Sequence, residues 1–237
     1  MTNPTLVTVP CFSGAPWDEQ QLAPLSAFPV RTMRLPDGID DVETYADFVA
    51  SQVADLDDYV LVGDSFGAVI SLTLALRRPA GLRALVLSGG FAANPLPRWK
   101  QVAARTSRYG AGPVYRQGTL RFHARELASE FDATAEVPHT QADYRRLFVE
   151  NTPAASYAGR VSSVIGFDVR DQLDRVDVPT LLITPADDKL IGEQAAQELR
   201  DGLPNAKEVI LPETGHMFRF THPGLYGRTI TDFLATV

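Results

Sequence analysis

A serine between two glycines, at the junction of a strand and a helix, constrains this fold more than any other feature. Residues 59–62 form a short, continuous apolar run, which is typical of a strand buried on both faces. The run breaks at Gly63, and an apolar, helix-compatible segment continues from Phe66 to about Leu76. Because a strand that turns directly into a helix brings its backbone close to itself, residues without a Cβ atom are needed beside the turn, and Gly63 and Gly67 supply them.

Ser65 lies at the apex of this turn. The turn predicts a strained backbone at Ser65 and a hydroxyl group raised above the sheet, the arrangement of a nucleophile elbow. A Gly-x-Ser-x-Gly match alone is a weak signal, since a chain of this glycine and serine content contains one by chance in roughly one case in twenty. Its position between a strand and a helix gives the motif its weight. A tight structural turn with an idle serine is the alternative.

The flanking segments predict an alternation of strands and helices. Further apolar, β-rich runs lie at residues 6–9, 30–35, 84–88, 180–184 and 208–211. Segments with helical periodicity separate several of these runs, and such an alternation is typical of a parallel sheet with helices on both faces. The sequence therefore predicts the α/β class, with a mostly parallel sheet of about six strands flanked by helices.

The stretch from residue 93 to residue 164 interrupts this alternation. It contains no strand-like run, and its helical patterns are broken by glycines and prolines. We expect residues 93–164 to form a helical cap inserted into a core made of residues 1–92 and 165–237. Basic side chains outnumber acidic ones in the cap, which indicates either an anionic substrate group or, more simply, a solvated helical surface.

The composition narrows the classes of function. The chain has 237 residues, of which 45% are hydrophobic and 22% charged, as in a globular enzyme with a large core. Its net charge of −7 argues against nucleic acid or an anionic membrane surface as a partner. Cys11 is the only cysteine, so no internal disulfide forms. The first residues lack the basic and apolar segments of a signal peptide, and we expect a cytoplasmic protein.

A serine hydroxyl needs a base, and the base needs a third group to orient it. His216 follows the apolar run at 208–211, and Asp188 follows the run at 180–184. A right-handed crossover places both residues at the carboxyl ends of adjacent parallel strands, on the edge where Ser65 ends its own strand. The sequence therefore predicts that these three side chains converge. The residues left as alternatives are Asp187 for the acid, and His123, His139 and His222 as the other histidines. His123 and His139 belong to the cap, where we expect them at the surface, and Asp64, beside the serine, is expected to form a local hydrogen bond or to be solvated.

With this serine, acid and histidine order, the chain resembles the α/β-hydrolase fold family. The segments that carry the resemblance are 63–67, 187–191 and 215–216, and it covers the chain outside the cap. The resemblance implies that Ser65 is the nucleophile and that His216 is the general base and later acid. It implies that Asp188 orients His216 and stabilises its charged form. The chain departs from the family pattern in one respect, because we expect its sheet to lack the usual antiparallel N-terminal hairpin.

The resemblance points as well to the loop after the first strand. In the family, a His-Gly segment there often supplies one N–H of the oxyanion hole, but the matching positions here are Pro10, Cys11 and Phe12. The donors implied are the backbone N–H groups of Phe12 and Phe66, each worth about 3 kcal/mol in the transition state. Cys11 is expected to be a small packed residue, since nothing in the sequence activates it.

The implied activity is that of a serine esterase, a hydrolase without cofactor or metal that cleaves small to medium carboxylic esters through an acyl-enzyme. The partner expected is a small-molecule ester, with neither nucleic acid nor a membrane. The same triad serves lactonases, thioesterases and C–C bond hydrolases, so the fold does not choose among them. Acyl transfer to an alcohol or peroxide, or a receptor-like member that only binds its ligand, are further alternatives.

Overall fold

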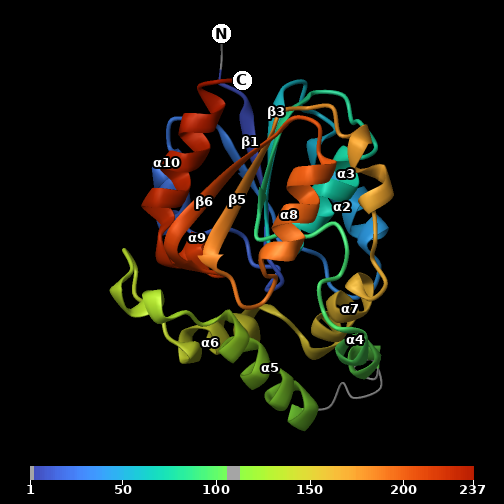
Figure 1. The fold of residues 1–237 in the computed structure, drawn as a ribbon, viewed down its shortest axis with the longest axis vertical. Helices are drawn as coiled ribbons and strands as arrows, with labels where there is room; N and C mark the ends of the chain where they lie inside the picture. The colour runs from blue at the N-terminus through green and yellow to red at the C-terminus, as the bar shows by residue number, and fades with distance from the viewer. Residues whose placement is uncertain (1–2, 106–112) are drawn as a thin grey trace.

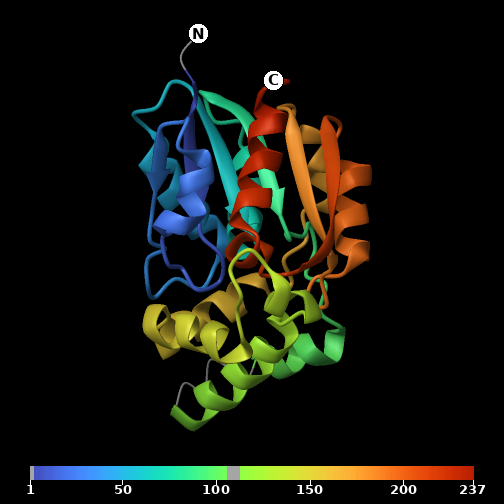
Figure 2. The same cartoon turned by 90° about the vertical axis from the view of Figure 1, so that its left-hand side faces the viewer.

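A parallel sheet with helices on both faces forms the centre of the computed structural model, which describes residues 3–105 and 113–237 (Figures 1 and 2). In these residues the sheet has six strands in the order β2-β1-β3-β4-β5-β6, and all neighbours are parallel. The predicted fold class is therefore confirmed. The strands are β1 (Thr5–Val9), β2 (Val30–Thr32), β3 (Tyr59–Asp64), β4 (Leu82–Ser88), β5 (Thr180–Asp187) and β6 (Ala206–Gly215).

Two separate hydrophobic clusters, one on each face, explain why the strands are continuous apolar runs. In β3, Tyr59 and Leu61 pack into one cluster, whereas Val60 and Val62 pack into the other. A strand covered on both faces has no solvent side, so its sequence does not alternate. The helices of the core are α1 (Glu19–Leu22), α2 (Val42–Val53), α3 (Phe66–Ala75), α8 (Glu193–Gly202), α9 (Phe218–Thr221) and α10 (Pro223–Leu234).

Helix α3, which follows the elbow, is the most enclosed helix of the core. All ten of its residues are buried, which explains why it is apolar on every side instead of amphipathic. It packs against α2 on one side and against the sheet on the other. The start of α3 is thereby held rigidly at the carboxyl edge of the sheet.

In the described residues, four α-helices between β4 and β5 lie beyond the carboxyl ends of the strands, at the lower end of the molecule in Figures 1 and 2. They are α4 (Arg98–Arg105), α5 (Pro113–Leu127), α6 (Gln141–Asn151) and α7 (Ala154–Val164). We call them the cap. A third hydrophobic cluster joins α5, α6 and α7 to Met217 of the core. The division into domains at residues 93 and 164 stays a prediction.

The structure extends two strands beyond their expected ends. The pairing of β5 with β6 continues to Asp187 opposite Gly215, because the two strands keep their hydrogen bonds across an irregularity near Pro185. Strand β2 is shorter than expected and ends at Thr32, since its pairing with β1 stops at Thr8. The longer strands carry Asp188 and His216 to the edge of the sheet.

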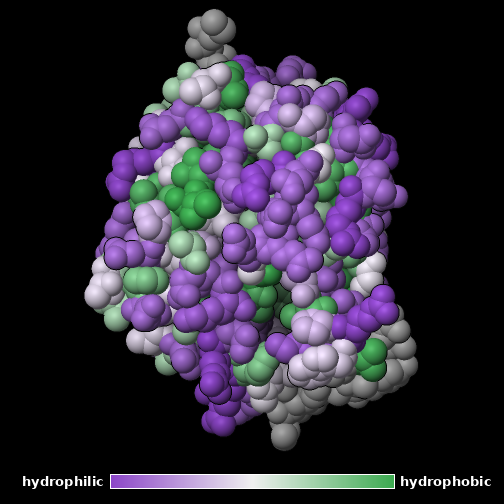
Figure 3. Space-filling model, in the orientation of Figure 1, coloured by the Kyte–Doolittle hydropathy of each residue, from purple (hydrophilic) through white to green (hydrophobic). Residues whose placement is uncertain are grey.

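Seen from the side of Figure 1, the surface is mostly hydrophilic (Figure 3). Hydrophobic side chains gather in a few places, one of them a hollow between the cap and the body of the molecule. Within the described ranges, the helices are all too short or too polar to cross a membrane.

Candidate active site

Ser65 is held in a strained conformation at the junction of β3 and α3. Its φ of 54° and ψ of −114° lie outside the regions that residues with a Cβ atom usually adopt. The neighbouring glycines permit this turn, because a Cβ on Gly63 would collide with the carbonyl group of Gly67. A Cβ on Gly67 would in turn collide with the carbonyl oxygen of Val9 in β1. The elbow therefore has the geometry that the sequence predicted.

His216 and Asp188 meet Ser65 in one chain of hydrogen bonds. The Nε2 atom of His216 lies 2.9 Å from Ser65 Oγ, and its Nδ1 atom lies 2.8 Å from Asp188 Oδ2. Because an ionised carboxylate only accepts hydrogen bonds, Nδ1–H donates to Asp188 and Nε2 is left to accept from the serine hydroxyl. The other oxygen of Asp188 accepts the backbone N–H groups of Leu190 and Ile191, at 3.0 and 2.9 Å.

The charges of this pair are set by burial and by mutual attraction. Burial alone would lower the pKa of His216, but the charge of Asp188 and the hydrogen bond to it outweigh burial and raise that pKa. Burial alone would raise the pKa of Asp188, yet His216 and the N–H donors around the carboxylate lower it. The carboxylate therefore stays ionised and makes the histidine a stronger base than usual.

The residues left as alternatives lie elsewhere. Asp187 turns toward the cap, where its Oδ2 accepts from Ser129 Oγ at 2.8 Å and lies 3.2 Å from Lys189 Nζ. The ring of His139 stacks on Tyr144, and His222 Nδ1 lies 2.8 Å from the hydroxyl oxygen of Thr221. Of the two neighbouring carboxylates, Asp188 is the one in contact with His216.

Asp64, next to the serine, has a partner that the sequence did not reveal. Its Oδ2 accepts from Arg219 Nε at 2.7 Å, and both side chains are buried. The same guanidinium donates to Gln21 and lies over the rings of Trp17 and Phe220, at 4.6 and 4.0 Å from the centroids. The expectation of a local or solvated role for Asp64 is wrong, because a buried arginine from α9 neutralises it.

The two predicted oxyanion donors lie on either side of the serine. Phe66 is the first residue of α3, where a helix leaves its N–H groups without intrahelical partners. Phe12 belongs to the loop after β1, and its ring lies 5.7 Å from that of Phe66. Both residues line the same cavity as Ser65. Across the described residues, neither of these N–H groups donates to another backbone group.

A mostly apolar cavity of about 560 Å³ opens between the serine and the cap. Among the described residues, its wall contains one lysine and one carboxylate, Lys100 and Glu126. Two large exposed side chains also contribute to it, Trp99 at 69% and Phe122 at 54% exposure. The apolar residues of the wall include Phe12, Phe66, Phe91, Leu96, Val161, Val164, Ile165, Leu190 and Ile191.

The arginines of the cap do not face this cavity, as far as their side chains are described. Arg98, Arg121, Arg125 and Arg146 are exposed, and Arg160 is buried elsewhere. The described arginines of the cap therefore lie in solvent or in internal contacts. A solvated helical surface explains them better than a binding site for an anionic substrate group. The side chains of Arg105, Arg108 and Arg116 lie outside the described residues.

His123 was expected at the surface of the cap, but its ring lies in the cavity wall. It contacts the rings of Phe12 and Phe148, at 5.4 and 4.8 Å between centroids, and its Nδ1 lies 3.3 Å from the Tyr157 hydroxyl. Burial, and then the nearby charge of His216, lower the pKa of His123 to about 3. It is therefore a neutral polar group in a mostly apolar wall.

In the part of the chain that is described, no three His, Cys, Asp or Glu side chains gather as metal ligands. Cys11 is buried, with its Sγ 3.4 Å from Ser13 Oγ. The expectation of a cofactor-free reaction stays a prediction.

Comparison with known proteins places this geometry in a broad group. The family model described as the alpha/beta hydrolase fold matches residues 10–223. The proposed carbamate hydrolase RutD of Pseudomonas savastanoi pv. phaseolicola is 31% identical over 185 residues, which cover 73% of this chain. That match spans 66% of the relative, slightly under two thirds of its length. The protein of the same name from Variovorax paradoxus is 28% identical and is covered to 79%.

Solved structures resemble the whole chain. A thermophilic esterase from Thermogutta terrifontis aligns with a TM-score of 0.83 at 18% identity, covering 100% of this chain and 90% of the esterase. The enol-lactonase of Burkholderia xenovorans aligns with a TM-score of 0.79 at 19% identity, covering 99% and 92% of the two chains. At such identities the likeness concerns the fold alone.

Proposed function

The chain belongs to the α/β hydrolase family and is a hydrolase, and we propose that it is a serine hydrolase of carboxylic esters. The observation that carries the proposal is the hydrogen-bond chain from Asp188 through His216 to Ser65 beside an apolar cavity. A strained serine, a histidine with raised pKa and an ionised acid together make a nucleophile and its base.

In the proposed reaction Ser65 attacks the ester carbonyl while His216 takes its proton. The new bond leaves a negative oxygen, which accepts hydrogen bonds from the N–H groups of Phe12 and Phe66, each contributing about 3 kcal/mol. The carbon–oxygen bond to the alcohol then breaks, and His216 gives the proton to the departing oxygen. Water, activated by His216, attacks the acyl-serine and releases the acid and the free hydroxyl. Asp188 stays ionised and orients the imidazole throughout.

The cavity supports an uncharged substrate with an apolar acyl group. A volume of about 560 Å³ is in the range of small-molecule sites. Lys100 and Glu126 are opposite in charge, so the described wall has no net charge to attract an acid or an amine. An acyl group with its own carboxylate would lose its hydration in this cavity without gaining an ion pair of matching strength.

A carbamate is the second candidate, because the relatives that are 31% and 28% identical are named as proposed carbamate hydrolases. The same triad attacks a carbamate carbonyl in the same way. A carbamate needs polar partners for its nitrogen, however, and the cavity wall offers few of them, His123 among them. The apolar wall therefore favours an ester with a hydrocarbon chain. Lactones, thioesters and C–C bonds remain alternatives that use the same three residues.

A fluorophosphonate probe and a panel of esters test the proposal. The probe should label wild-type protein at Ser65, and Ser65→Ala should abolish both labelling and ester turnover. The matched control is Ser71→Ala, which changes a buried serine on α3 whose hydroxyl has no hydrogen-bond partner in the described structure. It should keep full activity. Wild-type protein that is neither labelled nor active on any ester would refute the proposal and favour a ligand-binding member of the fold.

The panel runs from acetyl to decanoyl esters of one alcohol, with a carboxylate-bearing acyl group and a matched carbamate added. We expect kcat/KM to peak at intermediate acyl length and to fall by about 10-fold or more for the charged acyl group. Faster turnover of the carbamate than of every ester would favour the second candidate.

A further inference from the structure

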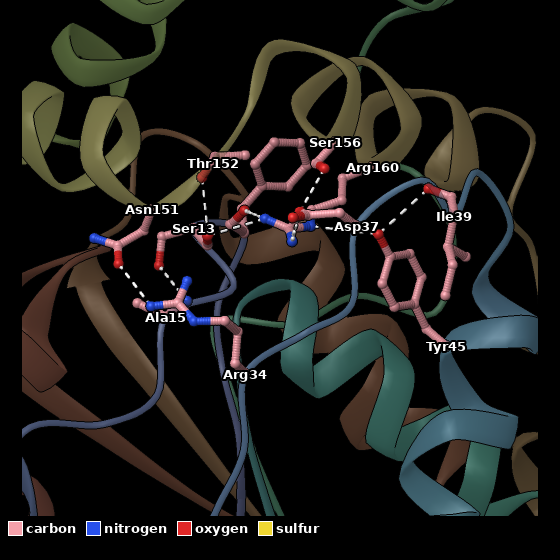
Figure 4. Close-up of polar contacts among 11 residues, drawn as sticks. Ser13, Ala15, Arg34, Asp37, Ile39, Tyr45, Asn151, Thr152, Ser156 and Arg160 are labelled. Carbon is pink, nitrogen blue, oxygen red and sulfur yellow. Dashed lines mark hydrogen bonds and ion pairs between the residues drawn. The ribbon is translucent and has the colours of Figure 1, made fainter.

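Arg160, in cap helix α7, is one of the most deeply buried side chains of the molecule, with 1% of it exposed. Its guanidinium reaches from the cap into the loop that follows β1 (Figure 4). Nη1 donates to the carbonyl oxygens of Phe12 and Ser13, at 2.9 Å each. Nε donates to the hydroxyl group of Tyr45, at 3.4 Å. One cap side chain therefore contacts the loop at two successive peptide groups.

The positive charge of Arg160 is stabilised mainly by the hydrogen bonds that these carbonyl oxygens accept. The nearest carboxylate, on Asp37, lies 3.9 Å from Nη2 and is mostly exposed. It also accepts from Ser156 Oγ at 2.5 Å, so its oxygens are shared. Burying a guanidinium group is unfavourable unless its N–H groups donate hydrogen bonds. The loop conformation and the arginine therefore support each other, because this arrangement of the loop directs two carbonyl oxygens at one nitrogen.

The loop is shaped closely around the guanidinium. Gly14 has a φ of 72°, and a Cβ atom there would lie 2.5 Å from Nη2 and 2.7 Å from Cζ of Arg160. Thr152, from the same part of the cap, donates its hydroxyl to the Ser13 carbonyl at 2.8 Å. Figure 4 shows Thr152 and Arg160 both turned toward Ser13. The loop has neither a histidine nor a glycine at positions 11 and 12, so it does not contain the His-Gly segment that is common in the family.

From these contacts we propose that Arg160 is a positioning residue for the oxyanion hole. It fixes the Phe12 and Ser13 carbonyl groups and thereby holds the Phe12 N–H in the direction of the reacting carbonyl. The inference rests on the proposed ester hydrolysis, in which that N–H is a donor. It makes the cap part of the catalytic apparatus as well as the roof of the cavity. If Arg160 only docked the cap, its loss would affect stability and substrate affinity but not the transition state.

The experiment compares Arg160→Met and Arg160→Lys with the matched control Arg34→Met. Arg34 makes another contact between core and cap, from Nη2 to Asn151 Oδ1 at 3.1 Å, but it is exposed, and the hydrogen bonds of the described residues do not join it to the Phe12 or Ser13 carbonyl. The readouts are kcat, KM, urea denaturation and the affinity for a trifluoromethyl ketone. This ketone forms a tetrahedral adduct with serine, and its oxyanion needs the same donors as the transition state.

We expect kcat to fall by about 100-fold in Arg160→Met and about 10-fold in Arg160→Lys, below the loss of a whole oxyanion donor. KM should change by less than about 3-fold, and affinity for the ketone should fall by the same factor as kcat. Arg34→Met should keep kcat and ketone affinity within about 2-fold of wild type.

The inference would be overturned if wild type is active and the folded Arg160 variants keep the wild-type kcat, with a change only in KM or in the free energy of unfolding. The proposed function would then stay intact. An inactive, unlabelled wild type would instead remove the proposed function itself. If neither Arg160 variant folds, Tyr45→Phe removes the hydroxyl group that accepts from Nε, together with the hydrogen bond that this hydroxyl donates to the Ile39 carbonyl. It should lower kcat and ketone affinity together by about 3-fold, and an unchanged kcat would count against the inference.

Discussion

Two buried pairs of an acid and a base lie beside Ser65, and their geometry is almost the same. Asp188 contacts His216 at 2.8 Å, and Asp64 contacts Arg219 at 2.7 Å. All four side chains are at most 6% exposed. Burial and distance alone would assign them the same role. The comparison shows that these two quantities do not identify a catalytic pair.

The difference lies in the third partner and in the chemistry of the base. His216 directs its second nitrogen at Ser65 Oγ, and an imidazole can be neutral or charged near neutral pH. Arg219 directs its remaining N–H groups at Gln21 and the faces of two aromatic rings, and a guanidinium does not lose its proton. We therefore assign chemistry to the first pair and stability to the second. The predictions below test that division.

The largest expected effect is on turnover, in Asp188→Asn. The amide cannot hold His216 in the tautomer that accepts the serine proton, so kcat should fall by about 10³–10⁴-fold. Asp64→Asn, which alters the other pair, should lower kcat by less than about 10-fold. Steady-state kinetics on the best ester of the panel would measure both. An equal fall in kcat in the two variants would contradict the assignment of chemistry to the first pair and stability to the second.

The next effect is on stability, in Arg219→Met. This variant leaves Asp64 charged and buried without its partner, so the free energy of unfolding should fall by about 3–5 kcal/mol. In the double variant Asp64→Asn/Arg219→Met neither member of this pair carries a charge, and at least half of that loss should be recovered. Urea denaturation measures both values. A double variant as unstable as the single one would show that the arginine acts through packing on Trp17 and Phe220 instead.

A smaller effect concerns the pH dependence of activity. The base must be neutral to accept a proton, so kcat/KM should rise with pH as His216 loses its proton. Asp188 raises the pKa of His216 against the effect of burial, so the midpoint should lie above the ordinary histidine value of about 6.5. Asp188→Asn should move the midpoint to lower pH. The double variant at the other pair should move it less, since Asp64 contributes the smallest of the named causes.

The same shifts predict where the first pair stabilises the fold. A raised pKa means that the contribution of His216 is present below the ordinary histidine pKa and is lost as pH rises through the folded value. A lowered pKa means that the contribution of Asp188 is present above the ordinary aspartate pKa and is lost as pH falls through the folded value. Wild type should therefore exceed Asp188→Asn in stability most between the ordinary aspartate and histidine pKa values, and the margin should shrink toward the folded value on either side. A pH series of denaturation curves would test this window.

The smallest effect concerns His123, the other histidine near the serine. Its pKa of about 3 keeps it neutral over the working range, so it does not titrate in the activity profile. His123→Asn should leave the midpoint within about 0.3 pH units and change kcat/KM by less than about 3-fold on apolar esters. A midpoint that moved clearly would mean that His123 shares the proton with His216.

The sequence predicted the first pair and missed the second for a physical reason. Asp188 and His216 follow apolar strands, and the parallel topology brings strand ends together at one edge of the sheet. Arg219 and Asp64 follow no such rule, because they lie 155 positions apart and arginine is usually a surface residue. Only the packing of α9 beneath the elbow reveals that this arginine is buried.

The cap was predictable as helices but not in its contacts. Its broken helical patterns indicated helices, and α4 to α7 are helical. The burial of Arg160 depends on how α7 meets the loop after β1, whose Ser13 is 147 positions away. The placement of His123 depends in the same way on how α5 lies over Phe12. Strand ends were predictable only approximately, because pairing with a neighbour decides them, as the continuation of β5 and β6 shows.

The positive φ of Ser65 sets selection for activity against selection for stability at one position. Glycine adopts such a backbone without steric conflict, so the fold alone would favour glycine over serine there. Among inactive variants, Ser65→Gly should therefore unfold at higher urea concentration than Ser65→Ala, which a pair of denaturation curves would check. A duplicated gene that is no longer selected for activity could accumulate glycine at position 65, whereas selection for activity retains the serine even though it makes the fold less stable.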